Sequence, residues 1–287
     1  MEKAKTMTDK EKKELLVRAA EIRKDTMRAI ASIGLGHVGG SLSVAELLAV
    51  LYFREMKVDP ANPKMPDRDR LVMSKGHCGP ALYSALAQRG FFDREILLTL
   101  NKPDTILPSH CDMNRTPGID MTTGSLGQGI SAAMGIAIAN KLDKRKNTVY
   151  FVLGDGECQE GQVWEAAMLA SHRKLDNVIG FLDYNGLQID GTIDEICSLG
   201  DVAGRFTSFG WDCQTVDGHD PEAIADAIEK AKTVAGKPHM IVLKTVKGKG
   251  VSEFENKPSS HSATVSPEQL AKALSEMDEF ISEVNGK

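Results

Sequence analysis

The chain has 287 residues, which is enough for one large domain or two small ones. Hydrophobic residues make up 41% of it and charged residues 26%, a globular balance that excludes an intrinsically disordered protein. Thirty-five Lys and Arg against 40 Asp and Glu give a net charge of -5, which argues against a nucleic-acid-binding surface.

The composition also predicts a cytoplasmic protein without membrane spans. The longest apolar region, residues 29–53, is interrupted by polar side chains such as His37 and Glu46. The N-terminal stretch MEKAKTMTDKEKKELL is charged where a signal peptide needs an apolar core. The five cysteines form no CxxC pair and are odd in number, which favours reduced thiols in the cytoplasm.

The first predicted element is a long amphipathic helix. Apolar residues recur at steps of three and four from Leu15 to Ile33, with Lys and Glu between them. Thr8 and Glu11 form a capping box at its start. The glycine-rich segment 34–40 then ends this helix.

A second helix is expected to begin at a second capping box, Ser43 with Glu46, and to run to about Met56. Residues 57–69 are rich in Pro and Asp, and this composition is typical of a surface loop.

From Arg70 onward, short apolar runs alternate with amphipathic stretches. Because fully apolar strands need cover on both sides, this alternation predicts an α/β fold, a mostly parallel sheet with helices on both faces. We expect a single domain over 1–287, in which 251–287 forms a loop and a C-terminal helix. The strands are expected at 71–73, 148–153, 178–182, 212–216 and 240–245, and the helices at 79–89, 127–142, 159–173, 221–235 and 267–283. Capping side chains before a proline, Asp220 and Ser266, open the last two helices.

One glycine pattern is misleading. Gly34, Gly36 and Gly39 fit the GxGxxG pattern of dinucleotide-binding proteins. That pattern needs a strand directly before it, whereas the residues before Gly34 are helix-periodic and charged. We therefore interpret the segment as a helix-breaking loop, which leaves the histidine within it, His37, unexplained.

A stronger motif follows two neighbouring predicted strands. The run TVYFVL ends in Gly154-Asp155-Gly156, and the next strand ends in a segment that contains Asn185 and Leu187. Parallel strands deliver such residues to one sheet edge, where a carboxylate, an amide oxygen and a free carbonyl suit Mg²⁺ and leave room for phosphate oxygens. Glycines let backbone N–H groups approach a phosphate closely. The alternative is a tight turn in which Asp155 only caps the following helix.

These segments resemble the transketolase family. The run from Gly154 to Gly191 is similar to the thiamine-diphosphate motif of transketolases, which starts at GDG and closes on an Asn. The resemblance extends to GHVGGSLSVAELLAVLYF (36–53), DRLVMSKGHCGPALYSAL (69–86), LPSH (107–110) and GIDMTTGSLGQGISAAMGIA (118–137). It covers only the family's N-terminal domain, so it implies a thiamine-diphosphate-binding fold and the N-terminal subunit of a split transketolase.

The resemblance implies a role for each matched residue. Asp155, Asn185 and the backbone carbonyl of Leu187 would hold Mg²⁺, with Ca²⁺ or Mn²⁺ able to take its place. Leu126 and Ile189 match the apolar residues that pack around the cofactor's thiazolium ring.

Other matched residues would contact the diphosphate. The Gly156 amide, His77 and His261 are expected there, since imidazole N–H groups add partial or full positive charge beside an anion. The match is loosest at His261, because Ser260 and Ser262 stand where the family often has Trp and Gly. The remaining cofactor-binding positions are Gly124, Gly154, Glu160 and Asn185, of which Glu160 matches a family contact between cofactor domains.

Two further histidines match residues of the family's substrate channel. His37 and His110 would transfer protons to and from sugar hydroxyls, as imidazoles of near-neutral pKa can. The three remaining histidines have no such support and are interpreted as structural: His172, His219 and His239.

The implied reaction is ketol transfer from a ketose phosphate to an aldose phosphate. It would need a C-terminal partner subunit, because the pyrimidine-binding domain and its activating glutamate lie outside the matched region. Two copies of each chain in a heterotetramer are expected, since cofactor sites in the family form between protomers. Two alternatives stay open: a synthase that joins pyruvate to glyceraldehyde phosphate, and a non-catalytic scaffold that binds the cofactor. The sequence does not identify the donor or the acceptor sugar.

Overall fold

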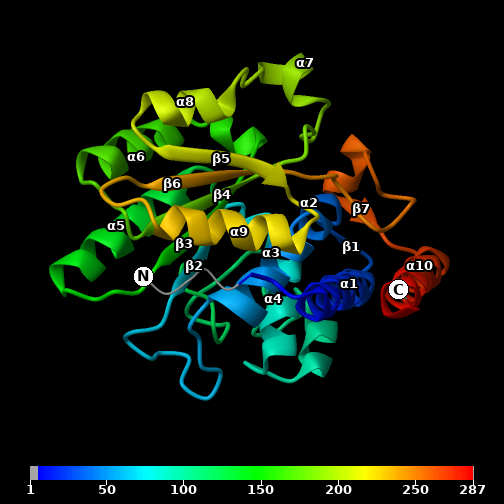
Figure 1. Ribbon diagram of the computed structural model, residues 1–287. Coiled ribbons are helices and arrows are strands. Elements are labelled where there is room, and N and C mark those ends of the chain that lie inside the picture. Colours follow the sequence, from blue (N-terminus) through cyan, green and yellow to red (C-terminus); the bar gives the residue numbers. More distant parts are fainter. Residues whose placement is uncertain (1–5, 287) are drawn as a thin grey trace.

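A five-stranded parallel sheet forms the centre of the computed structural model, which describes residues 6–286 (Figure 1). The strands lie in the order β2-β3-β4-β6-β5, and every neighbouring pair is parallel. The expected strands are thus all confirmed, within one or two residues at each end. Their bounds are β2 Arg70–Met73, β3 Val149–Gly154, β4 Val178–Tyr184, β5 Asp212–Asp217 and β6 His239–Lys244.

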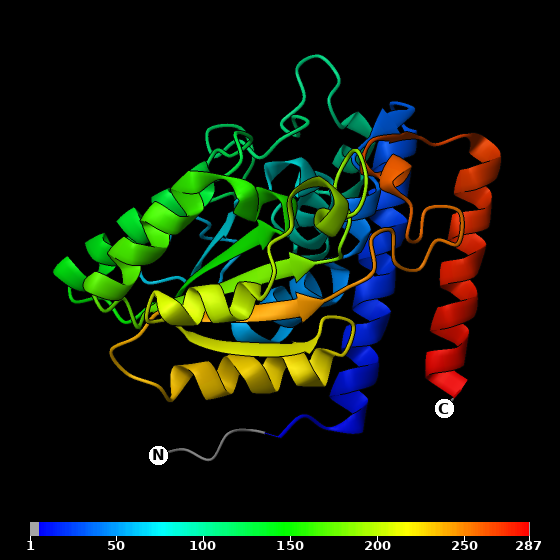
Figure 2. The same ribbon diagram turned by 90° about the horizontal axis from the view of Figure 1, so that it is seen from above.

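Each face of the sheet carries its own hydrophobic core, and successive side chains along a strand pack alternately into the two cores. Along β3, Phe151 and Leu153 enter one core, whereas Tyr150 and Val152 enter the other. The prediction of helices on both faces is therefore confirmed (Figure 2). On one face lie α5 Gln128–Leu142, α6 Gly161–His172 and α8 Val202–Ser208; on the other lie α1 Asp9–Ala31, α2 Gly39–Leu42, α3 Ala45–Val50, α4 Gly79–Arg89 and α9 Pro221–Lys232.

The C-terminal segment folds back over the glycine-rich segment 34–40. A single turn of 3₁₀ helix at Pro258–His261 leads into β7, Ala263–Thr264, which pairs antiparallel with β1, Leu35–Gly36. The last helix, α10 Pro267–Gly286, then lies along the outer side of α1 (Figure 2). Neither α10 nor any other helix in residues 6–286 is both long and apolar enough to cross a membrane.

The predicted capping box of Ser43 and Glu46 is wrong. Helix α3 begins only at Ala45, and no side chain caps it. The Ser43 hydroxyl instead donates a hydrogen bond to Asp183 Oδ2 at 2.7 Å, and both Glu46 oxygens accept from Arg23 of α1, at 2.7 and 2.6 Å. The pattern fails because buried partners from distant segments bind these side chains more strongly than the local backbone does.

Three other predicted caps are confirmed, at Thr8, Asp220 and Ser266. Three short α-helices were not predicted: α2, α7 Ile193–Cys197 and α8. The start of α7 carries a complete capping box of its own, Thr192 with Glu195, which is a signal that the sequence offered. The predicted helix at 159–173 begins at Gly161, after a short 3₁₀ turn.

Candidate active site

The carboxyl ends of β3 and β4 lie side by side, and Asp155 and Asn185 follow them directly. Asp155 ties the two ends together, because its Oδ1 accepts a hydrogen bond from the Gly156 amide at 2.8 Å and its Oδ2 one from the Gly186 amide at 2.6 Å. Gly186 has a φ of 78°, a conformation that favours glycine. The first contact alone would suit a capping role, whereas the second reaches across to the neighbouring strand.

Three residues that the resemblance marks as metal ligands lie at this edge. Asp155, Asn185 and Leu187 all line one cavity of about 240 Å³. No group of three or more His, Cys, Asp or Glu side chains in residues 6–286 could hold a metal ion. A metal at this edge would therefore depend on an amide and a carbonyl oxygen beside a single carboxylate. This all-oxygen donor set fits Mg²⁺.

Most residues that the resemblance marks as cofactor contacts line the same cavity. Gly124, His37 and His110 are not among its lining residues, although a Cβ added at Gly124 would lie 3.5 Å from the His110 ring. The exposed side chain of Ile189 lies at its mouth, with 63% of its surface accessible. The predicted residues that do line the cavity are His77, Leu126, Gly154, Asp155, Gly156, Glu160, Asn185, Leu187, Ile189 and His261.

Four histidines from four distant segments form a cluster beside the cavity. The His37 ring centre lies 5.3 Å from that of His77, 5.5 Å from that of His110 and 5.4 Å from that of His261. The centres of His77 and His261 are 5.0 Å apart. These are the same four histidines that the family motifs single out, and the fold brings them together.

The pKa of every histidine in this cluster is lowered, and burial is the main cause. Burial, followed by the nearby ammonium of Lys247, lowers the pKa of His261 to about 4. Burial and the charge of Lys75 hold the pKa of His77 well below its ordinary value, and burial lowers the pKa of His37 and of His110 as well. The lowered pKa values favour the neutral imidazoles, whose N–H groups offer the partial rather than the full positive charge of the expectation.

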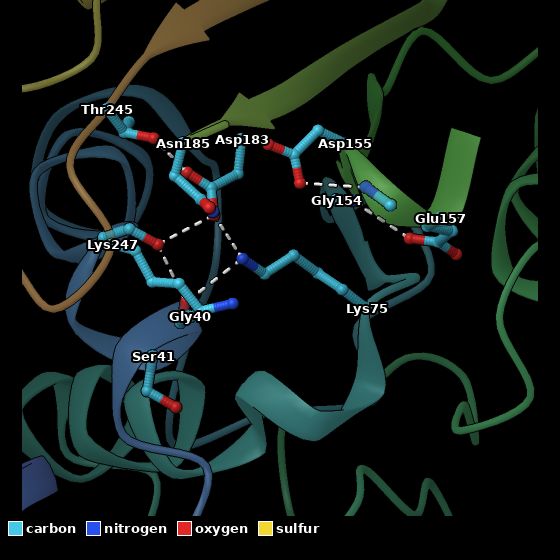
Figure 3. A network of polar contacts seen from close by, with 12 residues as sticks. Gly40, Ser41, Lys75, Gly154, Asp155, Glu157, Asp183, Asn185, Thr245 and Lys247 are labelled. Atoms are coloured by element: carbon cyan, nitrogen blue, oxygen red, sulfur yellow. Dashed lines mark hydrogen bonds and ion pairs between the residues drawn. The ribbon is translucent and has the colours of Figure 1, made fainter. Parts of the chain in front are cut away.

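Two buried lysines, Lys75 and Lys247, also line the cavity, and neither was predicted from the sequence (Figure 3). Lys247 is 2% exposed, and its Nζ donates to the Leu187 carbonyl at 3.0 Å and lies 3.3 Å from His261 Nδ1. Lys75 is 1% exposed, pairs with Asp183 and donates to the Gly40 carbonyl at 3.1 Å. Two features of the sequence could have indicated these lysines: Lys75 lies two residues before His77, and Lys247 begins the run KGKG.

Glu157, which was not predicted either, positions the turn that precedes α5. Its carboxylate accepts hydrogen bonds from the Gly127 amide at 2.9 Å and the Gly154 amide at 3.1 Å, and burial raises its pKa. Gly127 has a φ of 79°, and a Cβ there would come within 3.0 Å of Glu160. The turn therefore brings Leu126 and Glu160 together at the cavity wall.

The profile of the family described as "Transketolase, thiamine diphosphate binding domain" matches residues 15–278. The chain belongs to the transketolase family. The resemblance that the sequence motifs indicated is confirmed, and with it the thiamine-diphosphate-binding fold.

The transketolase relatives include separate subunits as well as longer chains. The chain is 56% identical over 257 residues to the 6-deoxy-6-sulfo-D-fructose transketolase subunit SqwG of a Clostridium species, covering 90% of this chain and 94% of that one. It is 41% identical over 269 residues to an apulose-4-phosphate transketolase subunit of Phocaeicola vulgatus, covering 92% and 95%. The crystal structure of Campylobacter jejuni transketolase matches with a TM-score of 0.87 at 34% identity, over 92% of this chain but only 43% of that one.

Proposed function

We propose that this chain is the cofactor-binding subunit of a two-subunit transketolase that transfers a two-carbon ketol unit between sugars. The observation that supports the proposal is a cavity of a transketolase-family domain that is lined by Asp155, Asn185 and Leu187 and by two histidines of the four-histidine cluster. The synthase and the scaffold remain as alternatives that the assays below separate. We further propose a single domain over 1–287 and a cytoplasmic location, which the five free cysteines fit.

The cavity would hold thiamine diphosphate together with Mg²⁺, for which Ca²⁺ or Mn²⁺ could substitute. Asp155, Asn185 and the Leu187 carbonyl would ligate the metal, and the residues that line the cavity beside them would contact the diphosphate. When bound, thiamine diphosphate supplies the electron sink for breaking a C–C bond. Lys247, buried against Leu187 and His261, would add the positive charge that neutral imidazoles lack.

His37 and His110 would act on the substrate. Neither residue lines the cavity that contains Asp155 and Asn185, and their ring centres are 5.5 Å apart. Their lowered pKa values keep them neutral, so each can accept a proton from a sugar hydroxyl or donate one.

Replacing these two histidines tests the assignment. With the partner present, His37→Ala and His110→Ala should each lower turnover or raise the donor KM, reducing kcat/KM by about 10²-fold, because each removes one proton-transfer group. Cofactor affinity, measured by calorimetry on the same samples, should stay close to wild type. If either variant loses cofactor binding while its donor kinetics hardly change, that histidine belongs to the cofactor side.

The donor sugar is proposed from the relatives. The 56% identity to a subunit named for 6-deoxy-6-sulfo-D-fructose favours a sulfonated ketose over a ketose phosphate. Assayed with its partner subunit, the enzyme should use 6-deoxy-6-sulfo-D-fructose with a kcat/KM at least about tenfold above that for fructose 6-phosphate. Preference for the phosphate would contradict the sulfonated donor. Condensation of pyruvate with glyceraldehyde phosphate would instead identify the synthase, and no turnover of any donor would favour the scaffold.

We propose that the outer face of α5 and α6 receives the pyrimidine-domain subunit. This face is apolar yet exposed: Leu142 is 78% accessible, Met168 52% and Leu169 42%, and a Cβ at Gly135 would meet no atom within 4 Å. Helix α5 begins two residues after Leu126 and α6 directly after Glu160, and both of these residues line the cavity, so a partner seated here would also reach the cofactor. A heterotetramer with two of each chain then follows from two-fold symmetry.

A single bulky residue should disrupt this contact. Gly135→Arg should leave the subunit folded, because the position is open, but should weaken partner binding at least about tenfold. Ala271→Arg, at an exposed position on the distant α10, is the matched control and should bind normally. Sedimentation velocity of the mixed chains measures both variants. Unchanged assembly of Gly135→Arg would place the interface elsewhere.

A further inference from the structure

Asp183 is a fully buried carboxylate that has no role in the proposed function. It lies near the end of β4, two residues before Asn185, and its accessible surface is 0%. Four side chains from four segments of the chain contact it, and Figure 3 labels Lys75, Asn185 and Thr245 among them. They are Ser43 between α2 and α3, Lys75 after β2, Asn185 after β4 and Thr245 after β6.

All four contacts are donors to the carboxylate. Oδ2 accepts from the Ser43 hydroxyl at 2.7 Å and from Asn185 Nδ2 at 3.0 Å, and it pairs with the Lys75 ammonium. Oδ1 accepts from the Thr245 hydroxyl. An ionised carboxylate can only accept hydrogen bonds. It therefore binds a side-chain amide at the NH₂ group of that amide and not at the carbonyl oxygen.

The contact between Asp183 and Asn185 therefore fixes the orientation of the Asn185 side-chain amide. An amide carries its carbonyl oxygen and its NH₂ group on opposite sides, and a rotation of 180° about the last bond exchanges them. Because Asp183 binds the NH₂ group, Asn185 Oδ1 points away from Asp183, to where the Leu187 amide donates to it at 3.1 Å. A rotated amide would direct N–H groups at a cation.

We propose that Asp183 is a positioning residue that fixes the amide of Asn185 so that Oδ1 faces the metal. The inference rests on the proposed metal site. Lys75 assists by balancing the buried negative charge, and Thr245 donates to the other carboxylate oxygen.

Metal affinity tests the proposal directly. In the complex with thiamine diphosphate and the partner chain, Asp183→Asn should bind Mg²⁺ and Mn²⁺ about 10- to 100-fold more weakly than wild type, because its amide can face Asn185 with either end. Calorimetry and Mn²⁺ electron paramagnetic resonance measure this without turnover. Ser43→Ala is the matched control: it removes a hydrogen bond to the same Oδ2 atom but leaves the Asn185 contact, so its metal affinity should stay close to wild type.

A double-mutant cycle separates orientation from a general structural role. A carboxylate presents an oxygen whichever way it is turned, so Asn185→Asp removes the need for orientation. In that background, adding Asp183→Asn should change metal affinity by less than about threefold. An equal loss in both backgrounds would overturn the proposal. If Asp183→Asn does not fold, all four proteins of the cycle are made with the additional substitution Lys75→Met. This substitution removes the buried ammonium that Asp183→Asn leaves without its partner.

One further variant distinguishes the failure of this inference from failure of the metal site. Asp155→Ala should weaken metal binding whatever Asp183 does. Wild-type affinity in Asp155→Ala would show that the metal site itself is wrong, and the inference would fall with it. A weakened Asp155→Ala beside an unaffected Asp183→Asn would overturn only the orienting role.

Discussion

The isolated chain should show no ketol transfer, and adding its partner subunit should raise the rate by at least about 10³-fold. The cavity in residues 6–286 would hold the metal and the diphosphate, and Ile189 at its mouth is 63% exposed. An open cavity leaves a bound diphosphate largely hydrated, which weakens binding. In the family, the group that activates the aminopyrimidine ring comes from the pyrimidine domain, which the partner would provide.

The measurement compares each purified chain alone with the mixture, at the same donor, acceptor and cofactor concentrations. Cofactor affinity is measured in parallel by calorimetry and should rise on mixing, because the partner closes the cavity. The Gly135→Arg variant mixed with the wild-type partner serves as the control for assembly, since this variant keeps the cavity but loses the proposed contact. Full activity of the chain by itself would contradict the two-subunit proposal.

Loss of a proposed metal ligand should have the second large effect. Asp155→Ala and Asn185→Ala should each weaken Mg²⁺-dependent binding of thiamine diphosphate at least about 100-fold, since a metal held by three protein oxygens has no spare ligand. Asp155→Ala also leaves the amides of Gly156 and Gly186 without their acceptor, so thermal unfolding must be measured alongside. Calorimetry on the assembled complex gives the affinities. Wild-type values in both variants would refute the metal assignment.

The pH dependence of metal binding gives an independent check. Burial, followed by the negative charge of Asp183, raises the pKa of Asp155 to about 6. A metal binds only the ionised carboxylate, so its affinity falls as pH falls through this value and should be about tenfold weaker at pH 5 than at pH 7. Asp155→Asn should bind weakly at both pH values and lose this part of the dependence. A flat profile for the wild type would mean that Asp155 does not ligate the metal.

Local sequence patterns determined the sheet and one edge of the site. The strands could be predicted because a sheet covered on both faces needs apolar side chains at consecutive positions, as in Val149–Leu153. Asp155 and Asn185 could be placed together because each directly follows a strand, and neighbouring parallel strands end at the same edge. The family resemblance then named the four histidines, although nothing in their spacing showed that they meet.

The tertiary structure decided the contacts between segments far apart in the chain. It closes the four-histidine cluster by folding His261 back over His37, at 5.4 Å between ring centres. It buries Lys75 and Lys247, which in the sequence look like solvated charges. It also turns Ser43 from a predicted helix cap into a partner of Asp183, 140 positions away. Local patterns cannot show such pairings, because a buried polar group binds whatever partner the fold places beside it.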